Sequence, residues 1–411
     1  MNTTTNPAIS FDNTEIAFAA KSDKQLKKAN FLYGLMGKAW IVKMGLKITP
    51  LAIRWHIPFT STLIRRTIFQ QFVGGETLEE TAKVADKLAG YDVQVILDYG
   101  VEGKEGEASF EYARNQFIKV IDYASTQSNI PFMSVKVTGF ARFALLEKVD
   151  AAMRAESGTL IKRYLAAVEK LPADEKAEWH NVRTRVHQVC ENGAAKKVGV
   201  LIDAEDSWIQ EPIDALTIIM MDMFNKERPA VYNTLQLYRH DRLQFLKDSY
   251  TAAVERGFIL GAKLVRGAYM EKERLRAAQM HYPSPIHADK AACDRDYNAA
   301  VEFCTGHLDR IALIVASHNE YSNLYTTQLL DKNDIPHHHA HVHFSQLYGM
   351  SDNITFNLAR SGCSVSKYLP FGPIRDVVPY LMRRAQENSS MSGQTGKELG
   401  LIRKEMKRRG I

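Results

Sequence analysis

Two neighbouring arginines, Arg383 and Arg384, lie in the segment YLMRRAQEN, and Glu387 follows them by one helical turn. A guanidinium group is planar and presents its N–H donors in a fork, so two of them can bind one carboxylate bidentately. Glu387 is spaced to reach both arginines on a helix. The alternative is a solvated, charged helix face, and the position of the helix in the fold decides between the two.

The residues around the arginine pair predict the helix that carries it. Asp376 is a plausible N-cap, and Pro379 then falls in the first turn, where its missing N–H costs little. Apolar side chains recur at helical spacing, which leaves Tyr380 and the arginines on the opposite face. The apolar stripe consists of Ile374, Val377, Val378, Leu381, Met382 and Ala385.

Eight segments rich in residues that favour β-strands precede this helix, and helical patterns separate them. Most of these runs are continuously apolar, as expected for parallel strands that are covered on both faces. Alternation of strand and helix eight times predicts a (β/α)8 barrel of the TIM type. The runs are residues 91–98, 131–138, 196–203, 229–236, 260–267, 311–318, 340–346 and 364–371.

Polar or titratable residues follow nearly every one of these runs. Active sites of such barrels lie at the carboxyl ends of the strands, so these residues are candidates for chemistry. An inert barrel would not need them, because a buried charge is costly unless it is paired. In chain order, the residues at the strand ends are Glu102, Lys136, Asp203, Gln236, Gly267, Ala268, Tyr269, His318, Asn319, Gln346, Leu347, Tyr368 and Gly372.

Asp203 and Lys136 are charges at or near the ends of adjacent apolar strands, so they could pair, either as a structural ion pair at the barrel rim or as functional groups. Gly267 would let the backbone approach a flat ligand, with Tyr269 beside it, or it marks a tight strand exit. His318 is interpreted as a catalytic residue, a nucleotide contact or a satisfied structural histidine.

Metal chemistry finds little support in the sequence. His341 and His343 would share one face of a strand, yet no third or fourth ligand is evident, so a loop and a core position are preferred and no metal is expected. The four cysteines are widely spaced and form neither a C-x-x-C pair nor a disulfide framework, which indicates buried thiols in a reducing compartment.

The length fits two or three small domains or one barrel with additions, and the alternation of strand and helix favours the barrel. We expect a helical region at 1–88, a catalytic barrel at 89–400 with a helical insertion at 142–195 between the second and third strands, and a basic tail at 401–411. A net charge of +6 does not indicate nucleic-acid binding. The basic segment 38–69 could contact an anionic membrane surface or pack on the rest of the protein. The basic tail could contact the same surface or be a solvated end. The sequence contains neither an apolar run long enough for a transmembrane helix nor a signal-peptide pattern. We therefore expect a protein that is cytoplasmic or peripheral on the inner membrane.

The segments LVRGAY, ASHN, QLYGM and KYLPFGP…YLMRRAQEN resemble proline dehydrogenase, the flavoenzyme family that oxidises L-proline, in its monofunctional branch. The resemblance covers roughly residues 91–389. It implies a (β/α)8 barrel with FAD at the strand ends and oxidation of L-proline to 1-pyrroline-5-carboxylate by hydride transfer to FAD. Electrons then pass to a quinone, in the first step of proline catabolism.

The resemblance also implies roles for individual residues. Arg383, Arg384 and Lys136 correspond to the clamp for the proline carboxylate, and Glu102 to an acid that pairs with the first arginine over bound substrate. Tyr269, Leu347 and Tyr368 correspond to the walls around the proline ring. Asp203 corresponds to the active-site aspartate near Lys136. The FAD contacts correspond to Gln236, Lys263, Val265, Gly267, Ala268, Lys290, His318, Asn319 and Glu387.

Three positions bear on how far the resemblance extends. Many bacterial members have Arg where Lys263 stands, near the flavin N5, and lysine keeps the charge but loses the fork. Many also have Trp where Met270 stands, which removes a flat face. Relatives that prefer hydroxyproline often carry Ser in place of Tyr368, whose ring would crowd a 4-hydroxyl group. The alternatives are therefore a dehydrogenase for another cyclic imino acid such as 4-hydroxyproline, or a non-enzymatic barrel that binds membrane surfaces.

Overall fold

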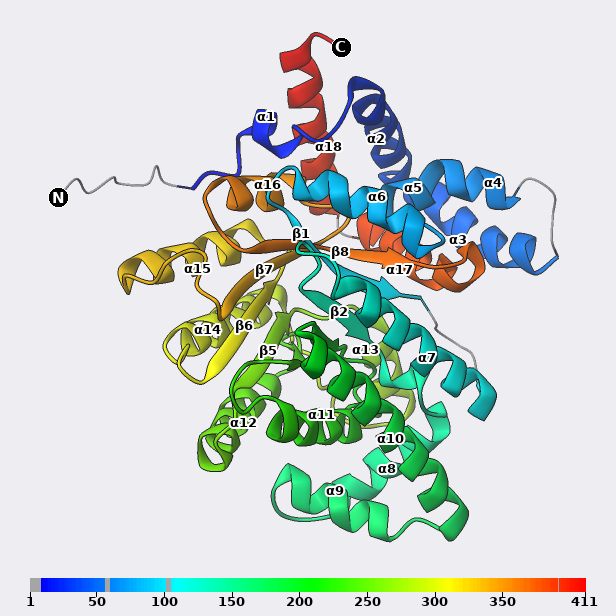
Figure 1. The fold of residues 1–411 in the computed structure, drawn as a ribbon. Coiled ribbons are helices and arrows are strands. Elements are labelled where there is room, and N and C mark those ends of the chain that lie inside the picture. The colour runs from blue at the N-terminus through cyan, green and yellow to red at the C-terminus, as the bar shows by residue number, and fades with distance from the viewer. Residues whose placement is uncertain (1–8, 56–59, 101–104, 391) are drawn as a thin grey trace. The chain divides into compact units, whose positions relative to one another are not determined.

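The computed structural model describes residues 9–55, 60–100, 105–390 and 392–411 (Figure 1). Eight parallel strands close into a barrel in chain order, which confirms the fold class predicted from the sequence. The strands are buried along nearly their whole length, as the continuous apolar runs indicated. They are β1 (Gln94–Tyr99), β2 (Phe132–Val135), β3 (Gly199–Ile202), β4 (Val231–Gln236), β5 (Leu260–Val265), β6 (Ile311–Ala316), β7 (Val342–Leu347) and β8 (Val365–Phe371).

The chain separates into two compact units. One unit contains residues 103–343 and the other contains residues 1–102 and 344–411. They are called the central unit and the terminal unit below. The domain boundaries expected from the sequence remain a prediction.

The central unit contains strands β2 to β6 and their helices. The long connection between β2 and β3 is helical, as expected, and its helices α8 and α9 pack on each other while α10 packs on α7. The buried Nε1 of Trp179 in α10 donates a hydrogen bond of 2.9 Å to the hydroxyl oxygen of Tyr164 in α9, which links the two helices. The helices are α7 (Glu107–Ala124), α8 (Phe143–Arg154), α9 (Leu160–Glu169), α10 (Ala173–Lys196), α11 (Gln210–Phe224), α12 (Arg242–Arg256), α13 (Met270–Gln279), α14 (Lys290–Thr305) and α15 (Glu320–Lys332), with a 3-10 turn η2 (Val137–Gly139).

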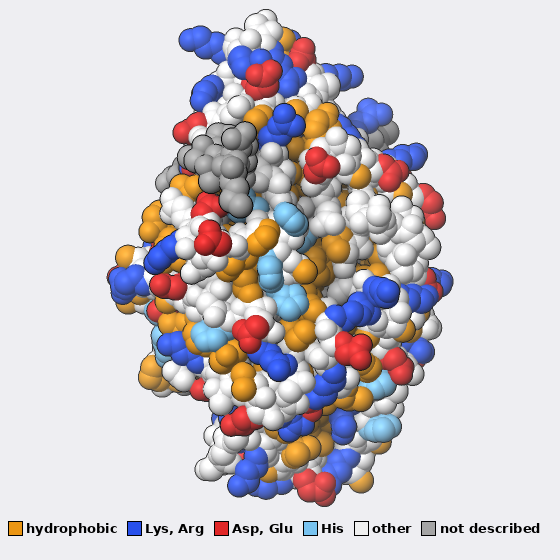
Figure 2. All heavy atoms as spheres, turned by 60° about the vertical axis from the view of Figure 1, so that its left-hand side comes forward, with side chains coloured by type: hydrophobic (Ala, Val, Ile, Leu, Met, Phe, Trp, Pro, Cys, Tyr) orange, Lys and Arg blue, Asp and Glu red, His pale blue; other side chains and the backbone are white. Residues whose placement is uncertain are grey.

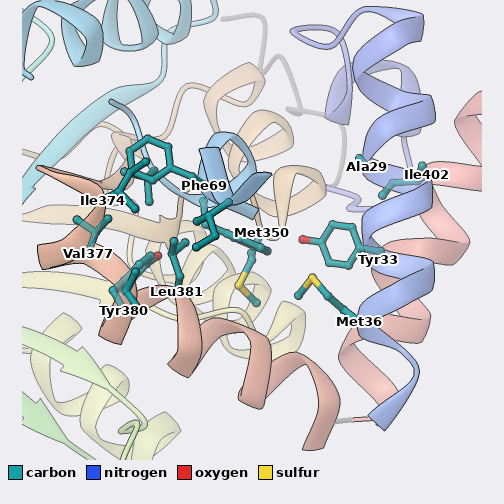
Figure 3. Packing of buried hydrophobic residues seen from close by; sticks show 14 of the residues in the cluster. Ala29, Tyr33, Met36, Phe69, Met350, Ile374, Val377, Tyr380, Leu381 and Ile402 are labelled. Carbon is teal, nitrogen blue, oxygen red and sulfur yellow. The ribbon is translucent and has the colours of Figure 1, made fainter. Parts of the chain in front are cut away.

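The terminal unit contains β1, β8, most of β7 and the remaining helices. Its core joins the N-terminal helices to the helix after β8, with Tyr33 and Met36 of α2 and Leu381 of α17 in one apolar cluster (Figure 3). The helices are α1 (Thr14–Ala17), α2 (Asp23–Met36), α3 (Ala39–Arg54), α4 (Thr60–Ile64), α5 (Gln70–Phe72), α6 (Leu78–Ala89), α16 (Asp352–Arg360), α17 (Ile374–Ser390) and α18 (Ser392–Arg409), and a π-helical turn η1 (Arg65–Phe69) precedes α5.

The basic C-terminal residues form the end of a helix. Arg408 and Arg409 lie at the end of α18 and pair with Glu405, one turn earlier. Arg409 also donates hydrogen bonds to the backbone oxygens of Lys21 at 2.8 Å and Phe18 at 2.9 Å. The end of the chain is thereby fastened to the segment between α1 and α2 in its own unit.

The start of α17 differs from the sequence prediction. The helix begins at Ile374, so Asp376 is within its first turn and the N-cap assignment was wrong. The N–H of Asp376 donates to the backbone oxygen of Pro373 at 2.8 Å. Pro379 consequently lies inside the helix and not in its first turn.

Candidate active site at the strand ends

Asp203 follows β3 and is the centre of a buried charge cluster in the central unit. Its Oδ1 accepts hydrogen bonds from Lys263 Nζ at 2.5 Å and from Ser134 Oγ at 2.7 Å. Lys136 Nζ lies 3.9 Å from its Oδ2. The pairing of Asp203 with Lys136 predicted from the sequence is therefore confirmed, but the shorter contact is to Lys263. That contact was not foreseen.

The strand register explains why Asp203 and Lys263 meet. Ile202 is opposite Asn233, so the next residue along, Asp203, is level with Thr234, and Thr234 is opposite Lys263. Alternate strands of a parallel barrel contribute side chains to the same interior layer, and β3 and β5 are alternate strands. An apolar run gives no information on this register, so the sequence could not show the pair.

The lysines determine the charge state of Asp203. Burial by itself would raise the pKa of this carboxyl, but the charges of Lys263 and Lys136 and the hydrogen bonds from Lys263 and Ser134 outweigh burial and lower its pKa below the usual value. Asp203 is therefore an anion at neutral pH. Its carboxylate neutralises Lys263, which is buried, and fixes the direction of that ammonium group.

Gln236 and Val265 end β4 and β5 and lie opposite each other in the register. The Nε2 of Gln236 donates to the backbone oxygen of Glu205 at 3.1 Å. Its Oε1 is buried and has no hydrogen-bond partner among the described residues. Because a buried polar atom without a partner is costly, this oxygen is positioned for a donor that the chain itself does not provide.

Gly267 lies just beyond β5 with a backbone φ of +121°, a conformation that favours glycine. A Cβ atom at this position would be 2.4 Å from the ring of Tyr238. Close packing on Tyr238 and the positive φ thus require the glycine, whereas the sequence suggested approach to a flat ligand. Ala268 and Tyr269 follow, and Tyr269 is half-buried directly before α13.

His318 and Asn319 follow β6. Asn319 is the N-cap of α15, where its Oδ1 accepts from the N–H of Ser322 at 3.1 Å, so that oxygen has a structural role. His318 is half-buried beside it. Lys290 is exposed at the start of α14 and pairs with Asp294.

Arg266, which the sequence reasoning did not select, ties the ends of β5 and β6 together. It donates to Ser317 Oγ at 2.7 Å and Ser322 Oγ at 2.9 Å and stacks over the ring of Tyr297 at 4.2 Å. It also pairs with Asp294 at 2.8 Å. An arginine immediately before the Gly-Ala-Tyr turn was the signal that could have identified it.

Leu347 and Tyr368, the predicted walls in the terminal unit, are neighbours. They are opposite each other in the register of β7 and β8, and the N–H of Tyr348 donates to the backbone oxygen of Tyr368 at 2.9 Å. Both side chains are half-buried, and Leu347 packs on the apolar cluster that contains Tyr380. The two side chains therefore form one apolar surface at the ends of these strands.

The arginine pair lies on α17 in the same unit. Arg384 is 7% exposed, and its guanidinium carbon lies 5.1 Å from the centre of the Tyr380 ring (Figure 3 shows Tyr380). Arg383 is half-buried. The solvated helix face is therefore excluded for Arg384. The side chain of Glu387 and all of Glu102 lie outside the described residues.

The histidines after β6 do not assemble a metal centre. Across the described ranges, no group of three or more His, Cys, Asp or Glu side chains could hold a metal ion. His343 is buried with its ring 5.0 Å from that of Phe132, and burial lowers its pKa to about 3. His341 Nδ1 is 2.6 Å from the backbone oxygen of Leu308.

No helix in the described part of the chain is long and apolar enough to cross a bilayer.

Known proteins resemble this chain over most of its length. A model of the proline dehydrogenase family matches residues 81–397. The carbapenem antibiotics biosynthesis protein CarD of Pectobacterium carotovorum is 34% identical over 82% of this chain and 83% of its own length. Mitochondrial proline dehydrogenase 1 of Dictyostelium discoideum is 31% identical over 84% of this chain and 65% of its own length. Hydroxyproline dehydrogenase of Xenopus laevis is 32% identical over 84% of this chain and 78% of its own length.

The fold also matches a solved structure. Proline utilization A (PutA) from Bdellovibrio bacteriovorus, inactivated by N-propargylglycine, aligns with a TM-score of 0.70 at 19% identity over 93% of this chain. The chain spans only 36% of the length of that PutA. With a family model matching well over half of its residues and relatives more than 30% identical, the chain belongs to the proline dehydrogenase family of oxidoreductases.

Proposed function

We propose that this protein oxidises L-proline to 1-pyrroline-5-carboxylate with FAD as its cofactor and a quinone as the final electron acceptor. The observation that carries the proposal is Arg384, a buried cation on the helix that follows the last barrel strand, with Arg383 beside it. Two adjacent guanidinium forks on one helix match an amino-acid carboxylate, which can accept hydrogen bonds from both.

The residues at the ends of β4 and β5 fit a flavin. An isoalloxazine ring presents both donors and acceptors at its edge. Gln236 offers a buried oxygen that needs a donor, and Lys263 offers a buried ammonium group whose direction Asp203 fixes. We propose that FAD is held by Gln236, Lys263, Val265, Gly267, Ala268, Lys290, His318, Asn319 and Glu387. When bound, FAD supplies the acceptor for a hydride, which no amino-acid side chain can supply.

The chain's own residues bind and orient the substrate in this proposal. Arg383 and Arg384 bind the carboxylate of proline, Lys136 adds a third positive charge and Glu102 pairs with Arg383 over the substrate. Tyr269, Leu347 and Tyr368 contact the ring and exclude water from it. Asp203 is a positioning residue, because it contacts Lys263, which is proposed to hold the cofactor, and Lys136, which is proposed to bind the substrate.

A quinone acceptor would place the protein at a membrane surface. Quinones dissolve in the bilayer, whereas proline is supplied from the aqueous phase. We propose a cytoplasmic protein that is peripheral on the inner membrane. The terminal unit contains the basic segment 38–69 that suggested this location.

The absorbance spectrum of the purified protein tests the proposed cofactor and substrate together. Flavin bands should be present and should bleach when L-proline is added without oxygen. A dye acceptor should be reduced only when proline is present. A colourless protein that reduces no dye with proline, even after incubation with FAD, would contradict the proposal.

A second candidate substrate is 4-hydroxyproline, because one relative is a hydroxyproline dehydrogenase. Tyr368 is half-buried opposite Leu347 and argues for proline, since its ring would crowd a 4-hydroxyl group on a substrate bound there. We expect kcat/KM to favour proline, and Tyr368→Ser to shift the ratio towards 4-hydroxyproline. A wild-type preference for 4-hydroxyproline would reverse the assignment.

A further inference from the structure

The segment from α3 to the π-helical turn η1 carries only positively charged ionic side chains. Between Asp23 and Glu76 the sequence contains no Asp or Glu, although Lys and Arg recur throughout this stretch. The stretch includes α2 after its first residue, α3, α4 and the π-helical turn η1. By contrast, positive and negative side chains are interspersed on the face shown in Figure 2. The N-terminal helices therefore differ in charge from the mixed surface that is usual for a soluble protein.

Helix α3 exposes a stripe of large apolar side chains. Trp40 is 66% exposed, Met44 is 48% exposed and Ile48 is 54% exposed. Their spacing of four residues places all three on one side of the helix. Lys43 and Lys47 are exposed beside the stripe. Single exposed apolar residues are normal, but three on consecutive turns form a continuous surface.

Exposed apolar side chains are concentrated in this part of the molecule. Of the fifteen large hydrophobic side chains that are exposed among the described residues, six lie between residues 31 and 63. Trp55, just after α3, is one of them, whereas Trp179 in the central unit is fully buried. Clustering of this kind marks an interaction surface more often than chance exposure does.

The opposite side of α3 is already packed within the terminal unit. Val42 is buried, Leu46 and Thr49 are half-buried, and the helix contacts α2 and α17 (Figure 1). The outer face, defined here as Trp40, Met44 and Ile48 with Lys43 and Lys47, is therefore available for a partner.

We propose that the outer face of α3 docks on an anionic lipid bilayer, with the helix lying in the plane of the interface. Apolar side chains that include a tryptophan, flanked by lysines on a helix too short and too polar to span, are the features of an interfacial helix. The lysines match the negative potential of such a surface. The same charge argues against a second copy of the chain, because a two-fold contact would place cations against cations.

The docking surface is defined by the fold of the terminal unit and does not depend on the reaction. That docking brings the protein into contact with an electron acceptor dissolved in the bilayer rests on the proposed function. Because α3 packs on α17, the helix that carries Arg383 and Arg384 is adjacent to the docking element. Membrane binding and proline oxidation can therefore be measured separately on the same protein.

Co-sedimentation of the full-length protein with lipid vesicles tests the proposal. Vesicles of phosphatidylcholine with about 30% phosphatidylglycerol should bind the protein, binding should weaken in high salt, and pure phosphatidylcholine should bind it less. The variant Trp40→Ser/Met44→Gln/Ile48→Asn should bind the anionic vesicles at least about tenfold more weakly. Lys43→Glu/Lys47→Glu should also weaken binding, and only to the anionic vesicles.

A matched control uses apolar residues of similar exposure in the central unit. Leu165→Gln/Met223→Gln/Leu275→Gln should leave vesicle binding unchanged. Circular dichroism and proline-dependent dye reduction without vesicles should be the same for all of these variants, which separates a lost surface from a lost fold or a failed function. The proposal is overturned if the α3 variant binds vesicles as wild type does, if wild type does not bind them, or if the variant only converts a dimer to a monomer.

Discussion

The Oε1 atom of Glu398 accepts a hydrogen bond of 2.6 Å from the backbone N–H of Ser351. Helix α18 is thereby tied to the turn after β7, the strand that ends in Leu347. Two further contacts fix the same turn, because Tyr33 donates to the backbone oxygen of Gly349 at 2.6 Å and Lys367 donates to that of Met350 at 2.5 Å. The segment behind one candidate wall of the site is thus held by buried polar groups of the terminal unit.

Glu398 should make stability depend on pH near neutrality. Burial and the nearby charge of Asp352 raise its pKa to about 7, against the opposing effects of the Ser351 N–H, Lys367 and Lys21. The folded state then holds a proton that the unfolded state releases above its ordinary pKa of 4.5. This contribution to stability is complete below pH 4.5 and is lost as the pH rises to about 7.

The variant Glu398→Gln isolates this effect. It keeps an acceptor oxygen for Ser351 but does not ionise, so the difference in the free energy of unfolding between variant and wild type should grow from pH 5 to pH 8. The change should be on the order of 1–3 kcal/mol in favour of the variant. Denaturant titrations at several pH values measure it. A difference that stays constant across this range would show that Glu398 is ionised throughout.

Replacing Asp203 should destabilise the central unit. Asp203→Asn removes the charge that neutralises Lys263 and Lys136, so two cations would remain close together, one of them buried. The expected loss is roughly 3–5 kcal/mol, because an unpaired buried charge remains. Thermal unfolding measures the loss. In Asp203→Leu/Lys263→Met, which removes both members of the closer pair, the loss should be smaller than in Asp203→Asn, and an equal loss would contradict the charge argument.

Gly267→Ala should lower both stability and flavin content. Its new Cβ would collide with the ring of Tyr238, and its backbone φ of +121° disfavours any other residue. We expect a cost of about 2–4 kcal/mol. Gly257→Ala is the control, because Gly257 also has a positive φ but nothing lies within 4 Å of the added atom. If both variants lose the same stability, backbone strain alone is responsible and the Tyr238 contact is not.

The barrel could be predicted from the sequence because strand and helix periodicities are local. The pairing of Asp203 with Lys136 followed from the same information, since β2 and β3 are consecutive. The contact with Lys263 could not be predicted, because it crosses β4 and depends on the register of three strands. Apolar strands of this kind have no alternating pattern that would reveal the register.

The burial of Arg384 also required the structure. Helical spacing alone places Tyr380 and Arg384 on the polar side of α17. In the folded chain, Tyr380 joins the apolar cluster of the terminal unit and Arg384 lies over its ring. Tertiary packing therefore overrides the apparent polarity of this helix face. Likewise, Asn319 was selected as a ligand contact, while its side-chain oxygen is engaged in capping α15.

Truncation of Arg384 should weaken the binding of proline and leave the flavin bound. Arg384→Ala removes one fork of the proposed carboxylate clamp, so KM for proline should rise about 100-fold, or near 3 kcal/mol. Arg384→Lys should recover only part of this loss, because it restores the charge but not the bidentate geometry. Arg375→Ala is the matched control, since Arg375 is exposed on the same helix and its loss should leave KM unchanged. Steady-state kinetics with a dye acceptor and the flavin absorbance per mole of protein measure both effects. An Arg384→Ala enzyme with wild-type KM would remove Arg384 from the clamp, and loss of flavin with KM unchanged in the residual holoenzyme would assign it to the cofactor.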